Sequence, residues 1–396
     1  MSKIKFELES KFGSEYGAEE EAAMLEVLRK NAPTSGDACI AFEREFGAYC
    51  GTTQARAVSN GTAALFLALR ALGVGPGDHV LTTPLTWIAT AAAGATLGAE
   101  VDFVDVDPRT YNMDMAQVEA KLTPQTKAVL PVHLYGQCCD MDALRALGKK
   151  HGFAIVEDAC HAPGATWNGE KAGSMGTFGC FSFHEQKNMS TLGEGGMITT
   201  NDAALFEQVS LYRSHCTRVY GASTKYCALD EKKRPMGKQF WFQDFDDVGY
   251  NFRMTDMQAA VGSVQLRKLD ALNVHRALLA QQLDAALADV PGLVLPYVRP
   301  EAGHVWHLYP LQILPEFGLS KEDFVYRMLH DHGVKIGTHY IPLHYTTAFQ
   351  KRGGRKGQLP VAEGLYERLV TLPLHPRLTE EGLGYLVEAI KSVGSR

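Results

Sequence analysis

The sequence has no excess of positive charge and no long run of hydrophobic residues. Its 396 residues include 39 Lys and Arg against 45 Asp and Glu, which gives a net charge of −6. This balance argues against a nucleic acid or an anionic membrane as partner, so an anionic substrate would need a local group of cations. No hydrophobic run approaches the roughly 18 residues of a membrane span. The first ten residues carry both Lys and Glu and do not read as a signal peptide, so we expect a cytoplasmic protein.

The eight cysteines form no CxxC pair and show no Cys/His spacing typical of a zinc site. Cys138 and Cys139 are adjacent, which suits neither an ordinary disulfide nor a metal site. We therefore expect reduced structural thiols and no bound metal.

Strand and helix patterns alternate regularly along the first two thirds of the chain. Strands are expected at residues 55–58, 79–83, 100–106, 127–132 and 153–157, and helices at residues 19–30, 62–72, 87–97, 114–122 and 141–151. This alternation predicts an α/β fold, in which a mostly parallel mixed sheet lies between helices. We assign residues 1–270 to this large domain, including an N-terminal helical segment.

Residues 271–396 are assigned to a smaller C-terminal α+β domain. A long helix from Thr255 towards Leu283 leads into it, followed by strands at 305–314 and 334–338 and helices at 321–332 and 379–393. The regular pattern fails between residues 215 and 245, which are polar, aromatic and basic. A functional loop and a solvated insertion both remain open there.

Several polar or aromatic residues follow the expected strands, where open α/β sheets place their sites. Gly61 and Thr62 begin a helix after a strand and suit a phosphate, although in isolation a plain helix cap is the better explanation. Trp87, at the start of another helix, suits stacking on an aromatic cofactor, or a place in the core. Ser182 ends an apolar strand and could bind the same phosphate.

The charged candidates are Asp158 and Lys187. Asp158 ends a strand, where it could pair with a pyridinium nitrogen, and His161 follows it closely enough to contact the same ring. Capping and structural roles are the plain alternatives for these two. Lys187 follows the strand that ends at Ser182, and burial would lower its pKa and free the amine for attack on a carbonyl. Most lysines are solvated surface charges, but this combination, in this order, is what pyridoxal phosphate (PLP) requires.

Over nearly its whole length the chain resembles the sugar aminotransferases of the DegT/DnrJ/EryC1/StrS family, of fold type I. The matching segments are Ser59–Leu65, Pro84–Ala91, Glu157–His161, Ser182–Gly196 and Gly249–Asp256. The form Ser-Phe-His-Glu-x-Lys-Asn, together with residues 339–344, is most similar to members that act on nucleotide-linked 4-keto-6-deoxy sugars. One family relative with His at the lysine position dehydrates its substrate, so Lys187 favours transamination.

The resemblance implies a role for each candidate. Lys187 would form the internal aldimine and carry the proton, Asp158 would bind the pyridine nitrogen, and Trp87 would stack on the ring. The phosphate would be held by Gly61, Thr62 and Ser182, and by Asn251 of the neighbouring subunit, so a homodimer with shared sites is expected. Residues expected to face the substrate are Arg253, His339 and Tyr340, with the basic residues of 215–245.

The predicted function is a PLP-dependent aminotransferase that moves an amino group from glutamate or glutamine to a nucleotide-linked keto sugar, with ping-pong kinetics. Two alternatives remain open. The acceptor could be a keto-cyclitol, which lacks the diphosphate. The chain could also be a PLP-binding regulatory protein without turnover, because fold alone does not determine function. Intact Lys187 and Asp158 favour an enzyme.

Overall fold

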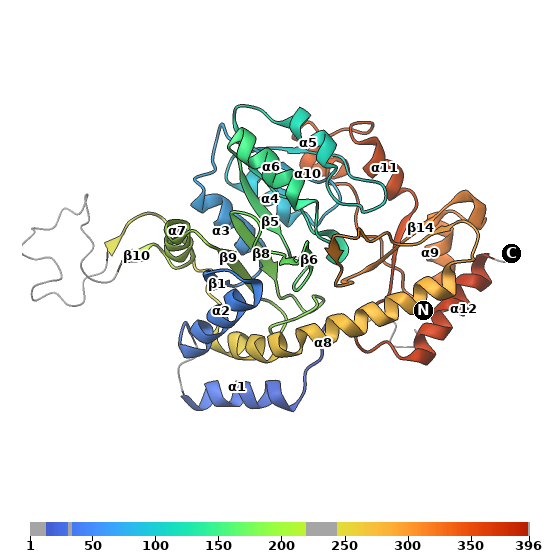
Figure 1. Ribbon diagram of the computed structural model, residues 1–396, viewed down its shortest axis with the longest axis horizontal. Helices are drawn as coiled ribbons and strands as arrows, with labels where there is room; N and C mark the ends of the chain where they lie inside the picture. The colour runs from blue at the N-terminus through green and yellow to red at the C-terminus, as the bar shows by residue number, and fades with distance from the viewer. Residues whose placement is uncertain (1–12, 31–33, 219–243, 395–396) are drawn as a thin grey trace, which may run out of the picture.

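The computed structural model describes residues 13–30, 34–218 and 244–394 of the chain (Figure 1). A seven-stranded sheet with the order β1-β9-β8-β5-β4-β2-β3 forms the centre of the larger part. All neighbours from β8 to β3 are parallel, whereas β9 pairs antiparallel with both β1 and β8. The strands are β1 (Gln54–Val58), β2 (His79–Thr82), β3 (Glu100–Phe103), β4 (Thr126–Val129), β5 (Ala154–Asp158), β8 (Phe178–Ser182) and β9 (Gly196–Thr200).

Helices cover both faces of this sheet. One face packs against α2 (Asp37–Cys50), α5 (Met115–Lys121), α6 (Met141–His151) and the first half of α8 (Asp256–Leu287). The other packs against α3 (Gly61–Ala71), α4 (Ala89–Thr96) and α7 (Ala203–Arg213). Because both faces are covered, β8 is buried throughout, with Phe181 in one core and Phe178 in the other. The α/β fold predicted from the alternating pattern is confirmed.

A further hydrophobic core, the C-terminal core, lies around the last turns of α8, where the helices and strands of the C-terminal part gather (Figure 1). It joins this helix to α9 (Lys321–His330), α12 (Glu380–Gly394) and an antiparallel sheet of β12 (Leu293–Val294), β14 (Tyr309–Ile313) and β15 (Leu369–Leu372). The expected strand at 334–338 is wrong, since only Gly337 forms an isolated bridge, with Thr371. Its first residue instead closes α9, through the bond from the Val334 amide to the Met328 carbonyl. The domain boundary at residue 270 stays a prediction.

The remaining elements are small or peripheral. Within the described residues they are α1 (Ala18–Lys30), β6 (Thr166–Trp167), β7 (Glu170–Lys171), β10 (Thr217–Arg218), β11 (Asp244–Phe245), β13 (Ala302–Gly303), α10 (Thr347–Gln350), α11 (Pro360–Tyr366) and the 3₁₀ turns η1 (Leu134–Gly136), η3 (Pro315–Phe317) and η4 (Leu343–Tyr345). Strands β10 and β11 pair with each other. Most of the irregular segment 215–245, namely residues 219–243, lies outside the described residues, so its proposed functional role stays a prediction.

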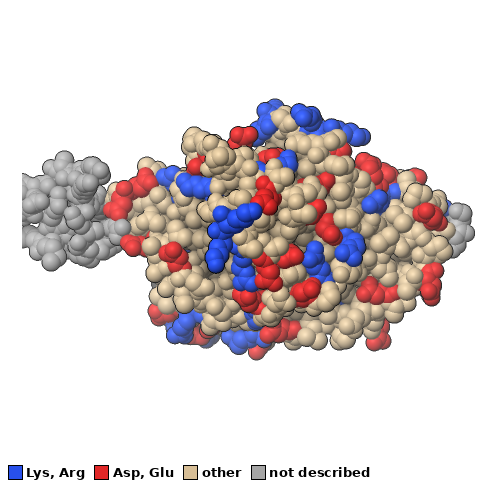
Figure 2. Space-filling view, turned by 45° about the horizontal axis from the view of Figure 1, so that its top comes forward, with Lys and Arg blue, Asp and Glu red and all other residues tan. Residues whose placement is uncertain are grey.

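The surface carries both signs of charge. On the face shown in Figure 2, acidic and basic side chains are interspersed over most of the surface, in keeping with the small net charge of −6. None of the helices in the described part of the chain combines the length and the apolar character needed to cross a membrane.

Candidate active site

A cavity of about 940 Å³ opens where β5 and β8 end and α3 and α4 begin. Nine of the residues singled out in the sequence line it, namely Gly61, Thr62, Trp87, Asp158, His161, Ser182, Lys187, His339 and Tyr340. The other two do not. Asn251 is exposed and pairs with Ser214, and the Arg253 guanidinium donates to the Ser214 hydroxyl at 2.8 Å. Their neighbours Tyr250 and Phe252 do contribute to the cavity wall.

Lys187 lies in a tight turn that follows β8. Its backbone N–H donates to the His184 carbonyl at 2.8 Å, and the next residue, Asn188, is completely buried. The Asn188 amide donates to the Asn273 side chain at 2.9 Å and to the Val305 carbonyl at 2.8 Å, which anchors the turn. Burial lowers the pKa of Lys187, although Cys160 and Asp158 act in the opposite direction. A lowered pKa increases the fraction of free amine, which is the nucleophilic form.

Asp158 is the last residue of β5, a central strand, and its side chain is buried in the cavity wall. The Thr90 hydroxyl donates to Oδ2 at 2.7 Å, and the Cys160 backbone N–H donates to Oδ1 at 3.2 Å. Thr90 also contacts the Thr86 hydroxyl at 2.9 Å. We did not single out Thr90 from the sequence. No local pattern marks it, because Thr86 lies before the start of α4 at Ala89 and the partner Asp158 is 68 positions away.

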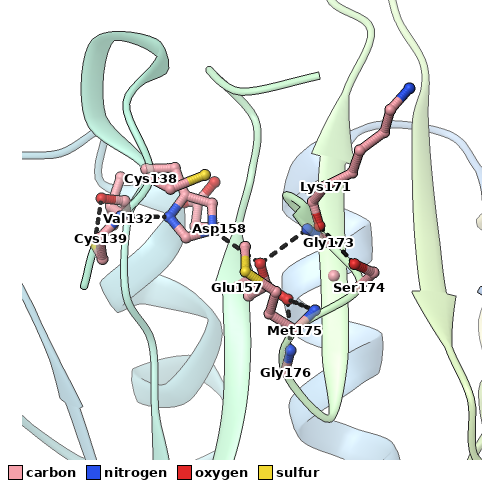
Figure 3. Close-up of polar contacts among 12 residues, drawn as sticks. Val132, Cys138, Cys139, Glu157, Asp158, Lys171, Gly173, Ser174, Met175 and Gly176 are labelled. Atoms are coloured by element: carbon pink, nitrogen blue, oxygen red, sulfur yellow. Dashed lines mark hydrogen bonds and ion pairs between the residues drawn. The ribbon is translucent and has the colours of Figure 1, made fainter. Parts of the chain in front are cut away.

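The adjacent Glu157 is fully buried and points away from the cavity, because successive side chains of a strand face opposite sides. Its carboxylate accepts a hydrogen bond from His133 Nε2 at 2.9 Å and three from backbone N–H groups of the turn at 173–176, at 2.6 to 2.8 Å (Figure 3). A buried carboxylate is costly unless its oxygens are paired in this way. This network anchors the end of β5 that carries Asp158.

The start of α3 forms another part of the cavity wall. The Asn60 side chain caps the helix by accepting from the Ala63 amide at 2.8 Å, while the first N–H groups of a helix have no partner within it. Gly61 allows α3 to approach β8, because a Cβ there would lie 2.8 Å from the Ser182 Cβ. The N–H groups of Gly61 and Thr62 and the Ser182 hydroxyl thus gather at one place, an arrangement that suits a phosphate.

Aromatic side chains and histidines form the rest of the wall. Trp87 is 64% exposed, which excludes the alternative of a core tryptophan. The Tyr340 hydroxyl lies 3.2 Å from His161 Nε2, and the Tyr340 ring lies 6.3 Å from that of Trp87. Burial and the charges of Lys187 and His339 lower the pKa of His161 well below its usual range, and burial and Lys187 lower that of His339 to about 4. Both imidazoles are therefore neutral at physiological pH.

Comparison with known proteins identifies the family. The sequence profile of the DegT/DnrJ/EryC1/StrS aminotransferase family matches residues 14–391. The chain belongs to this family. It is 37% identical over 379 residues to the spore coat polysaccharide biosynthesis protein SpsC of Bacillus subtilis, covering 95% of each chain. Its structure matches that of DesV from S. venezuelae with a TM-score of 0.85 and 35% identity, over 96% of this chain and 95% of that one.

Members of the DegT/DnrJ/EryC1/StrS family depend on PLP, and the protein Spr1654 of Streptococcus pneumoniae, 27% identical with a TM-score of 0.86, has been solved in its PLP form. The cavity fits this cofactor. It offers a partly buried amine in Lys187, a carboxylate in Asp158 and a helix start for the phosphate. The protein is a PLP-dependent aminotransferase, as the sequence predicts.

Proposed function

We propose that this aminotransferase moves an amino group from glutamate or glutamine to a nucleotide-linked keto sugar. The observation that carries the reaction class is the single cavity that holds both Lys187 and Asp158. The acceptor class is supported by two relatives. One is dTDP-3-amino-3,4,6-trideoxy-alpha-D-glucose transaminase of Streptomyces venezuelae, which is 35% identical over 96% of this chain and 94% of the relative. The other is GDP-perosamine synthase of Caulobacter vibrioides, which is 38% identical over 89% of each.

PLP, when bound, supplies an electron-withdrawing ring for amino-group transfer. Lys187 would hold the cofactor through its amine, whose lowered pKa increases the fraction of the free, nucleophilic form. Its Nζ would also carry the proton removed from Cα of the amino donor. The Asp158 carboxylate, oriented by the Thr90 hydroxyl, would hold the pyridine nitrogen in its protonated form. Gly61, Thr62 and Ser182 would hold the phosphate.

His339 and Tyr340 form part of the cavity wall, and we propose that they face the keto sugar. Among the described residues of the lining, Lys187 is the sole Lys or Arg. Because Lys187 serves the cofactor, cations for a diphosphate must come from elsewhere. We propose that Arg253, together with the basic residues of 215–245, supplies them.

A homodimer with shared sites forms part of this proposal, with Asn251 reaching the phosphate in the partner's site. Large apolar side chains are exposed next to residues that line the cavity. Ile88 follows Trp87 in the sequence and Ile341 follows Tyr340, and these side chains are 36% and 45% exposed. Exposed apolar side chains around a cavity are typical of a surface that a second subunit covers.

A substrate panel tests the proposed reaction. Purified holoenzyme would be given glutamate or glutamine with dTDP- and GDP-linked keto sugars, the same keto sugars without nucleotide, and keto-cyclitols. Conversion of the cofactor is followed by absorbance, and the aminated product by mass spectrometry. We expect rapid amination of nucleotide-linked sugars only. Preferential amination of a keto-cyclitol would contradict the proposed nucleotide-linked acceptor. In a separate experiment, borohydride should fix the cofactor to Lys187, and its attachment to another lysine would contradict the proposed role of Lys187.

A further inference from the structure

Tyr135 contacts three histidines of the active-site region although it lies outside the cavity lining. It occupies η1, between β4 and α6, and its side chain is 1% exposed. Its backbone N–H donates to His161 Nδ1 at 3.4 Å, and its carbonyl accepts from the His307 N–H at 2.9 Å. Its hydroxyl donates to the carbonyl of His339. One residue therefore joins three segments that are far apart in the sequence.

The backbone of Tyr135 adopts a left-handed conformation, with φ 58° and ψ 1°. This region is unfavourable for a residue with a Cβ and persists where the surroundings enforce it, often at functional sites. The next residue, Gly136, has φ 104°, and a Cβ there would lie 3.0 Å from the Trp306 backbone nitrogen. The Val305 N–H donates to the Gly136 carbonyl at 3.0 Å. The turn at Tyr135 is thus locked against residues 305–307.

These contacts determine which nitrogen of His161 carries the proton. A backbone N–H can only donate, so Nδ1 of His161 accepts, and the neutral imidazole is protonated on Nε2. That nitrogen lies 3.2 Å from the Tyr340 hydroxyl and donates to its oxygen. The Tyr340 proton is then available to a group in the cavity. Tyr340 is held in place as well. The residue before it, His339, accepts a hydrogen bond at its backbone carbonyl from the Tyr135 hydroxyl.

A second set of bonds supports the same arrangement from His307. The Asn188 amide group is used as a donor to Asn273 and Val305, so its oxygen accepts from His307 Nδ1 at 3.0 Å. The His307 ring packs against that of His161, with centroids 4.2 Å apart. His161 is therefore held on one side by the Tyr135 amide and on the other by a ring that is tied to the residue after Lys187.

We propose that Tyr135 is a positioning residue of the aminotransferase site, which acts through Tyr340. Its hydroxyl holds the 339–340 segment over the cavity, and its amide fixes the tautomer of His161 that donates to Tyr340. This role does not depend on which donor and acceptor the enzyme uses, because both substrates would meet the same wall of the cavity.

The chain offers a matched control in Tyr111. This tyrosine is 2% exposed, its ring contacts that of Tyr135 at 5.8 Å, and its hydroxyl accepts from the Gln312 side chain at 3.0 Å. Tyr135→Phe and Tyr111→Phe each remove one buried phenol hydroxyl, but only the first releases the His339 carbonyl. In hydrogen–deuterium exchange on the holoenzymes, peptides that contain residues 339–341 should exchange faster in Tyr135→Phe and not in Tyr111→Phe. Equal exchange in the two variants would overturn the positioning role.

A double-mutant cycle tests whether Tyr135 acts through Tyr340. The readout is the rate at which glutamate or glutamine changes the cofactor absorbance, whichever donor wild type accepts. Loss of one buried hydrogen bond should slow Tyr135→Phe about tenfold in the wild-type background, but less than about twofold when Tyr340→Phe is already present. The same loss in both backgrounds would show that Tyr135 acts independently of Tyr340. If neither donor reacts with wild type, the donor assignment fails, and the exchange comparison still decides the role of Tyr135.

Discussion

Thr90 controls how the Asp158 carboxylate faces the cavity, because its hydroxyl donates to Oδ2 at 2.7 Å. Thr90→Val keeps the shape of the side chain and removes the donor. A hydrogen bond to a charged group contributes enough that we expect a roughly 10- to 100-fold slower reaction with the amino donor. Thr90→Ser keeps the hydroxyl and should stay within about threefold of wild type. Stopped-flow absorbance of the cofactor measures both rates. Equal losses in the two variants would mean that the methyl group, not the hydroxyl, matters.

Residue types at strand ends were enough to predict seven residues of the cavity wall, including Lys187 and Asp158, whereas His339 and Tyr340 were expected only from the family resemblance. The sequence did not indicate Thr90 or Tyr135. Their importance comes from hydrogen bonds to Asp158, 68 positions away, and to His339, 204 positions away. Such pairings depend on how the elements pack, and neither residue type is unusual for a helix start or a buried turn.

At the scale of elements, some helix caps can be predicted from the local sequence, and others depend on how the helices pack. The N-caps Asp114 and Thr255 are readable from the sequence, because each side chain accepts from an amide two or three residues ahead. Helix α2 begins at Asp37, but its N-cap residue is Gly36, which has no side chain to accept a hydrogen bond. Asp256, from the start of α8, supplies it by accepting from the Gly36 and Cys39 amides at 2.7 and 3.1 Å. No local pattern predicts a cap that comes from another helix.

Asp256→Ala should therefore destabilise the protein, because it leaves the start of α2 without its acceptor. Loss of a cap costs about 1–2 kcal/mol, and the buried position of Asp256 places the effect towards the upper end. The free energy of unfolding, from urea titration of the holoenzyme, measures the change. Asp289→Ala, at an exposed position beyond the other end of α8, is the matched control and should change stability by less than about 0.5 kcal/mol. A similar loss in both variants would contradict the capping role.

The expected strand at 334–338 shows why alternation alone is insufficient. Val334 and Ile336 are separated by Lys335 and are both buried in the C-terminal core, so they satisfy the pattern of a half-buried strand. The only strand-type pairing of this segment is the bridge at Gly337, and the Val334 amide donates to the Met328 carbonyl of α9 instead. A strand needs a partner at the right distance along several residues, and the sequence of the segment does not contain that information.

At the scale of the whole molecule, one chain supplies only part of what the proposed reaction needs. Lys187 and Asp158 line the same chain's cavity, whereas the Asn251 side chain is exposed to solvent. In the proposed two-fold dimer each chain presents the same surface, so Asn251 of one chain completes the site of the other. At every site, Lys187 and Asp158 then come from one chain and Asn251 comes from the other. This arrangement can be tested by mixing two inactive variants.

Lys187→Ala and Asn251→Ala chains should each be impaired as homodimers. When they are unfolded together and refolded with PLP, each mixed dimer contains one doubly damaged site and one intact site. With random pairing, half of the dimers are mixed, and activity should recover towards about a quarter of wild type. The matched control is Lys187→Ala mixed with Asp158→Asn. Because both residues serve the same chain's cavity, that mixture contains no intact site and should not recover. Mixed dimers, verified by native mass spectrometry, that stay inactive in the first mixture would show that Asn251 serves its own chain.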